Sequence, residues 1–175
     1  MYERNLAQAH ESNSTVLTVV HGLRKTYDDS AKQCQESDKP KDWTLNRMLY
    51  ANAQRMYGIG LFAACYTNAL LRTLSPPDTC LELRESARVL ALEIVKLAEE
   101  AMPLRPMATA FVLLCLLVAW ACTTDVALQS QIEDLYKQYS CDHANERHAP
   151  WDKDGYMTQC ILDSGLMVPD SSYSP

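Results

Sequence analysis

Apolar residues recur every three or four positions along most of the chain, a spacing that predicts amphipathic helices. The first periodic segment covers residues 3–34, and the polar stretch 28–42 that overlaps its end predicts a loop. Further helices are expected over residues 44–73, where a threonine supplies the N-cap, and over residues 79–101. Because no alternating pattern typical of strands is present, the sequence predicts an all-α fold.

The most apolar segment, residues 107–122 (MATAFVLLCLLVAWAC), carries no charge. A membrane-spanning helix needs about 20 apolar residues, so we interpret this shorter segment as a helix buried within a helical domain. The stretch Thr123-Thr124-Asp125 offers a cap for a fifth helix, which is expected to extend to about Tyr139. The predicted architecture is a single-domain bundle of about five helices, formed by residues 1–140 around the buried helix. An irregular polar tail follows over residues 141–175, with one short helix near 156–162.

Two glycines interrupt the second long helical segment. Gly58 and Gly60 each cost a helix up to about 1 kcal/mol relative to alanine. No strand precedes them, so they do not fit a phosphate-binding loop. We therefore expect them to mark a close approach between helices, or a kink.

Charge excludes one class of function. The formal net charge is −6, from 16 basic and 22 acidic side chains, whereas a module that binds duplex nucleic acid normally presents a basic surface. Direct nucleic-acid binding is therefore not expected. The N-terminal stretch MYERNLAQAHESN lacks the features of a secretory signal. We expect an intracellular protein, nuclear or cytoplasmic, whose seven cysteines stay reduced and mostly pack as small apolar residues.

Few residues suggest catalytic or metal chemistry, and the common hydrolase, phosphate-binding and dinucleotide signatures are absent. His21, within the first helix, is expected to be an ordinary surface or core histidine rather than a general base. The remaining candidates are potential cation ligands near the C-terminus, which we interpret as exposed loop residues: Cys141, Asp142, His143 and His148 as one group, and Asp152 and Asp154 beside Trp151 as another. No metal or cofactor is expected.

One set of side chains fits a ligand-binding role better. Aromatic and cationic groups lie on or beside the two most apolar helices: Tyr57, Tyr66, Arg105 and Trp120. If these side chains face one cavity, they suit an apolar ligand with a polar handle. The alternative is a packed core in which the tyrosine hydroxyls reach backbone or water.

Residues 43–140 resemble the C-terminal region of fungal zinc-cluster transcription factors. The likeness rests on three successive stretches: RMYGIGLFAACYTNALLRTL, SARVLALEIVKLAEEA and PLRPMATAFVLLCLLVAWACTTDVALQSQIEDLYKQY. The positions that match the family pattern are Tyr57, Gly58, Asn68, Arg105, Pro106, Ala119, Trp120 and Asp125. The DNA-binding cluster of that family, six closely spaced cysteines among basic residues, has no counterpart here. The resemblance therefore implies a regulator without its DNA-binding part.

Three functional hypotheses follow. The first is a regulatory module that acts by protein contact, with a full-length regulator as one partner, in the control of a fungal secondary-metabolite gene cluster. The second is a small biosynthetic protein whose helical interior binds a polyketide or terpenoid intermediate and guides cyclisation, hydration or isomerisation. The third is a degenerate fragment without independent function.

Overall fold

The computed structural model describes residues 2–35, 40–76, 80–105 and 109–141. These residues form five α-helices and one short 3-10 helix, with no strand among them, which confirms the predicted all-α bundle. The α-helices are α1 (Tyr2–Gln35), α2 (Pro40–Leu74), α3 (Cys80–Ala101), α4 (Thr109–Cys122) and α5 (Val126–Ser140). The 3-10 helix, Met102–Leu104, follows α3 directly.

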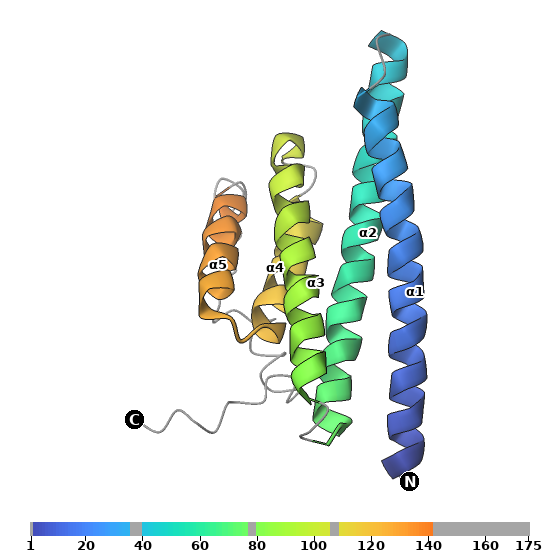
Figure 1. Ribbon diagram of the computed structural model, residues 1–175. Coiled ribbons are helices and arrows are strands. Elements are labelled where there is room, and N and C mark those ends of the chain that lie inside the picture. The colour runs from blue at the N-terminus through green and yellow to red at the C-terminus, as the bar shows by residue number, and fades with distance from the viewer. Residues whose placement is uncertain (1, 36–39, 77–79, 106–108, 142–175) are drawn as a thin grey trace.

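Successive helices run in opposite directions (Figure 1). The two longest, α1 and α2, pair along most of their length at one side of the molecule. On its other side α2 packs against α3 and α4, and α4 in turn packs against α5. The helix α2 is therefore the element that joins the long hairpin to the rest of the bundle.

The α1–α2 hairpin differs from the sequence prediction at its tip. The predicted loop over residues 28–42 is wrong for its first part, because α1 continues to Gln35, and α2 begins at Pro40 rather than Thr44. Asp28 lies within the helix, where its carboxylate accepts a hydrogen bond from Arg24 one turn earlier, at 3.1 Å, a pair that adds about 0.2–0.5 kcal/mol. Pro40 is compatible with the first helical position, where its missing N–H has no partner to lose. In residues 28–35 the polar side chains mark partial exposure and not the end of the helix.

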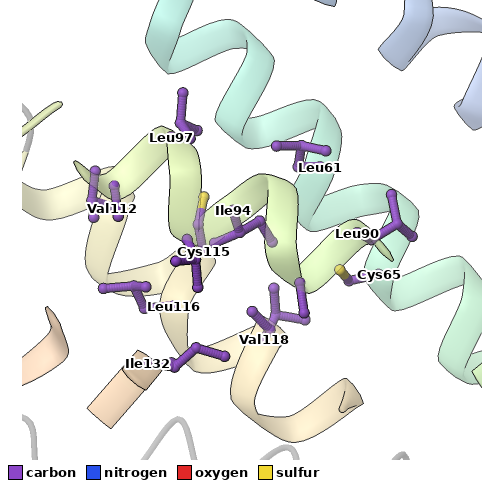
Figure 2. Packing of buried hydrophobic residues seen from close by; sticks show 14 of the residues in the cluster. Leu61, Cys65, Leu90, Ile94, Leu97, Val112, Cys115, Leu116, Val118 and Ile132 are labelled. Atoms are coloured by element: carbon purple, nitrogen blue, oxygen red, sulfur yellow. The ribbon is translucent and has the colours of Figure 1, made fainter. Parts of the chain in front are cut away.

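The core lies where α2, α3, α4 and α5 meet. Figure 2 shows side chains from these four helices converging, among them Leu61 of α2, Ile94 of α3, Leu116 of α4 and Ile132 of α5. All four are at most 1% exposed. The predicted buried helix is thus in place as α4, which packs against three neighbours and leaves Leu114 partly exposed.

The predicted cap of the last helix is also present. The Asp125 carboxylate accepts hydrogen bonds from the backbone N–H groups of Ala127 and Leu128, at 3.1 and 3.2 Å. Arg88 of α3 donates to the same carboxylate at 3.1 Å. The N–H of Leu128 and the Arg88 guanidinium hold the pKa of Asp125 below its usual range. One side chain therefore both starts α5 and ties it to α3.

Both interior glycines of α2 allow close packing, as expected. A Cβ built at Gly58 would lie 2.9 Å from the Phe111 ring of α4 and 3.1 Å from a Leu97 methyl group of α3. A Cβ at Gly60 would lie 2.9 Å from a methyl group of Leu23 on α1. The two glycines thus let α2 approach helices on two different sides.

Alanine substitutions at three glycines are expected to distinguish the effect of packing on the free energy of unfolding from the effect of helix propensity. Gly58→Ala is expected to cost about 1 kcal/mol, because overpacking against a ring outweighs the gain in helix propensity. Gly60→Ala is expected to be nearly neutral, since the flexible end of Leu23 moves aside. Gly22→Ala, where no atom lies within 4 Å, is expected to stabilise by about 0.5–1 kcal/mol. Urea unfolding of the three variants tests this order, and a Gly58→Ala protein as stable as Gly22→Ala would contradict it.

The cysteines of the described residues are free thiols, and three of them pack in the core. Cys115 donates to the Gly58 carbonyl at 3.3 Å, and Cys122 donates to the Cys65 carbonyl at 3.5 Å. Burial raises the pKa of Cys115 to about 12. These groups link α2 to α4, and the Cys115 thiol stays protonated at neutral pH. In the described part of the chain, the helices are all too short or too polar to cross a membrane.

Candidate functional site

Six side chains from three helices form one cluster at the contact of α1, α2 and α3. We call this set the tyrosine cluster: Arg24, Tyr27, Tyr50, Tyr57, Glu93 and Glu100. The ring of Tyr27 stacks on both other rings, with centroid separations of 5.4 Å to Tyr50 and 5.5 Å to Tyr57. Within the cluster, Arg24 and Tyr27 of α1 bond directly to Glu93 and Glu100 of α3.

Hydrogen bonds saturate this cluster. The Tyr57 hydroxyl accepts from Arg24 at 3.2 Å and donates to Glu93 at 3.1 Å, while Arg24 also pairs directly with Glu93. The Tyr27 hydroxyl donates to Glu100 and lies 3.0 Å from the Tyr50 hydroxyl. Burial raises the pKa of Tyr57 to about 12, and burial raises the pKa values of Tyr27 and Tyr50 in the same direction. All three hydroxyls therefore remain protonated donors at neutral pH.

The tyrosine cluster has no space for a ligand. The gap bounded by its Arg24, Tyr27, Tyr57 and glutamate side chains leaves no room for a water molecule. Its three tyrosine hydroxyls are directed at neighbouring members of the cluster and not into an open space. The cluster is a packed junction that fixes α1 on the bundle.

The four predicted ligand-binding residues lie in different surroundings. Tyr57 belongs to the tyrosine cluster, whereas Tyr66 is an exposed residue further along α2. The Arg105 side chain donates to the backbone carbonyl of Gln138 at 2.9 Å and lies over the Tyr139 ring. Trp120 donates through its indole nitrogen to Glu133 at 3.1 Å. Arg105 and Trp120 thus both bond to α5, Arg105 near its C-terminal end and Trp120 near its middle.

The remaining candidates that the structure describes, His21 and Cys141, lie in surroundings that suggest neither catalysis nor metal binding. His21 lies exposed on α1. Cys141 is exposed at the end of α5, while Asp142, His143, His148, Trp151, Asp152 and Asp154 lie outside the described residues. Within the described ranges, no three histidine, cysteine or acidic side chains gather closely enough to hold a metal ion.

Two buried amides lie on the core-facing side of α2. Gln54 and Asn68 are 0% and 1% exposed, and their amide nitrogen and oxygen atoms have no hydrogen-bond partner. Each such group costs roughly 1–3 kcal/mol. The two lie about 21 Å apart along the helix, so they do not form one site.

The largest unpartnered feature of α2 is an apolar surface on the side away from α3. We call it the α2 apolar face, formed by Leu45, Met48, Leu49, Met56, Ile59, Ala63, Tyr66 and Leu70. The six largest exposed members are each between 43% and 65% exposed. Exposed apolar residues are normally scattered singly, so a continuous row of this length makes this face the candidate contact surface of the described residues.

An open depression adjoins one end of this face. It has a volume of about 250 Å³ and is lined by Thr67 and Leu70 of α2 together with α1 residues Asn5, Gln8, Ala9 and Ser12. Small-molecule sites usually enclose about 300–1,000 Å³. The depression is smaller and open, and its lining includes none of the four predicted ligand-binding residues.

The apolar residues of α2 divide between core and surface, and Glu93 and Glu100 of α3 are both directed at α1. A signal for the second point was present: Glu93 and Glu100 lie two turns apart on one face of α3.

No protein-family model matches this chain, and no curated protein or solved structure matches it either.

Proposed function

We propose that this chain is a helical interaction module of transcriptional regulation, related to the C-terminal region of fungal zinc-cluster transcription factors. On this proposal it acts by contact with another protein chain, through the α2 apolar face, and not by binding DNA. The proposal extends to a role in a secondary-metabolite gene cluster and to a nuclear location, both of which rest on the resemblance alone.

The α2 apolar face is the observation that supports a contact function. A row of half-exposed leucine, methionine, isoleucine and tyrosine side chains on a rigid helix is suited to receive another helix. The tyrosine cluster offers no comparable opening, because its side chains fill the space between them. A binding role therefore finds better support on this surface than in the interior around Tyr57.

The test is to delete the gene in the organism that encodes it and to measure neighbouring transcripts and metabolites in the same culture. We expect the transcripts to fall together with the pathway product. An Ile59→Glu allele is expected to fail to restore them, because it places a charge in the middle of the α2 apolar face. Val89→Glu, an equally exposed position on α3, is the matched control and is expected to restore them.

Other outcomes would favour the competing hypotheses. Intact transcripts with an accumulated late intermediate would contradict the proposal and support handling of a small molecule. Transcripts and metabolites that both stay unchanged would indicate a chain without independent function.

A further inference from the structure

We propose that the α2 apolar face binds the same face of a second copy of this chain, with the two α2 helices antiparallel. This inference rests on the proposed function, because it names the partner of the same surface. Three properties of the face support it: the spacing of its residues, the placement of charge, and its area.

The spacing is that of a coiled-coil seam. Counting Asn52 with the apolar face, positions 45, 49, 52, 56, 59, 63, 66 and 70 alternate steps of four and three residues. The α1-facing side of α2 holds Tyr57 and Gly60, and the core-facing side holds Gln54 and Leu61, so this seam is a third side of the same helix. It faces no other described helix.

The seam is self-complementary when two copies meet around a two-fold axis between Met56 and Ile59. Met56 of one copy then lies opposite Ile59 of the other, and Leu49 lies opposite Tyr66. In the same register the polar Asn52 lies opposite Ala63, so no two large polar groups meet. A symmetric dimer requires a patch that matches itself in this way.

Charge favours the same arrangement. The chain as a whole carries −6, yet no acidic residue occurs between Thr44 and Pro77, and Arg55 is the one charged residue between Met48 and Leu71. Pairing through α2 therefore keeps the acidic surfaces of the two copies away from the contact. Arg55 and Phe62 lie one heptad apart on the same flank of the seam. In the antiparallel register Arg55 of one copy therefore comes near Phe62 of the other, and a cation and an aromatic ring attract each other.

The area is close to what a stable dimer needs. The six large apolar side chains are about half exposed, so together they offer roughly 600 Å² to a partner. Ala63, Leu70 and the flanking Phe62 add to this, and a standard interface buries about 800 Å² per partner. The depression beside Leu70 has room for a leucine side chain, and Leu45 of the second copy lies at that end of the seam.

Analytical ultracentrifugation of the full chain over a wide concentration range tests the proposal. We expect a monomer–dimer equilibrium in the wild type. Ile59→Glu and Met56→Lys are each expected to weaken association at least tenfold, because each buries an unpaired charge next to the two-fold axis. Both positions are half exposed in the single chain, so circular dichroism and thermal unfolding are expected to show folded proteins. Val89→Glu is expected to associate like the wild type.

Mixing the two charged variants tests the register. Because position 56 of one copy faces position 59 of the other, an equimolar mixture of the Ile59→Glu and Met56→Lys chains is expected to form heterodimers that neither forms alone. A wild type that stays monomeric, or single variants that still associate, would overturn the proposal. A mixture that stays monomeric would overturn the antiparallel register. A monomeric wild type whose Ile59→Glu allele still fails in the organism would overturn self-association alone and leave the proposed function standing.

Discussion

Leu116→Ala is expected to destabilise the protein by about 2–5 kcal/mol, while Leu114→Ala, on the same helix, is expected to cost less than about 1 kcal/mol. Leu116 is 0% exposed within the core and Leu114 is 40% exposed. The first substitution removes buried methyl groups and leaves a cavity, because α2, α3 and α5 hold α4 in place on several sides. The second removes groups that already contact water.

Urea unfolding followed by circular dichroism measures both values. Helix propensity barely differs between leucine and alanine, so the pair isolates burial. Equal losses for the two variants would contradict the core shown in Figure 2 and would indicate that α4 is covered on both of these sides.

The general architecture followed from the sequence because it depends on periodic burial. The uncharged run of residues 107–122 predicted a buried helix, and α4 occupies Thr109–Cys122. The Asp125 cap was also predictable, since a short acidic side chain before an apolar-periodic segment satisfies the first free N–H groups of a helix. Both features are local, and local chemistry is visible in sequence.

Two predictions overlapped at the end of α1: the helix over residues 3–34 is confirmed by α1, Tyr2–Gln35, whereas the loop over residues 28–42 is wrong for its first part. Residues 28–35 are polar, and polar clusters are typical of loops. They remain helical because α2 pairs with them: the Asn46 side chain, for example, donates to the Gln33 carbonyl at 3.4 Å. Contact with α2 outweighs the polar composition of residues 28–35. The apolar pattern alone does not show which residues of α2 lie beside them.

The candidate site was the least predictable part. Tyr57 was expected either to line a ligand cavity or to lie in a packed core with its hydroxyl on backbone or water. It is buried, but its hydroxyl partners are the Arg24 and Glu93 side chains from two other helices. Apolar spacing shows that α2 has a broad apolar face, and it does not show which part of that face its neighbours cover. The division between the core-facing side and the α2 apolar face depends on where α1 and α4 pack.

The tyrosine cluster is expected to make stability fall steeply in alkaline solution. Burial raises the pKa of Tyr57 to about 12, above the value of about 10 for an exposed tyrosine. A folded-state pKa above the unfolded one means that the stabilising effect is complete below pH of about 10 and is lost as pH rises through about 12. Tyr27 and Tyr50 shift in the same direction and add to this loss.

Urea midpoints measured across this pH range test the effect. At neutral pH, Tyr57→Phe is expected to cost about 0.5–1.5 kcal/mol, because it removes the hydroxyl bonds to Arg24 and Glu93. Above pH of about 10 its midpoint is expected to fall less steeply than that of the wild type, so the two curves converge. Cys115, whose pKa burial also raises to about 12, titrates in both proteins, and their difference therefore reports Tyr57.

Tyr66→Phe provides the control, since Tyr66 lies on the exposed α2 apolar face and outside the tyrosine cluster. It is expected to leave the alkaline loss of stability unchanged. If Tyr57→Phe and the wild type lose stability in parallel, the Tyr57 hydroxyl is not held as a buried donor between Arg24 and Glu93. Tyr57 would then hold α1 through ring stacking with Tyr27 and not through its hydroxyl, while Arg24 would still pair directly with Glu93.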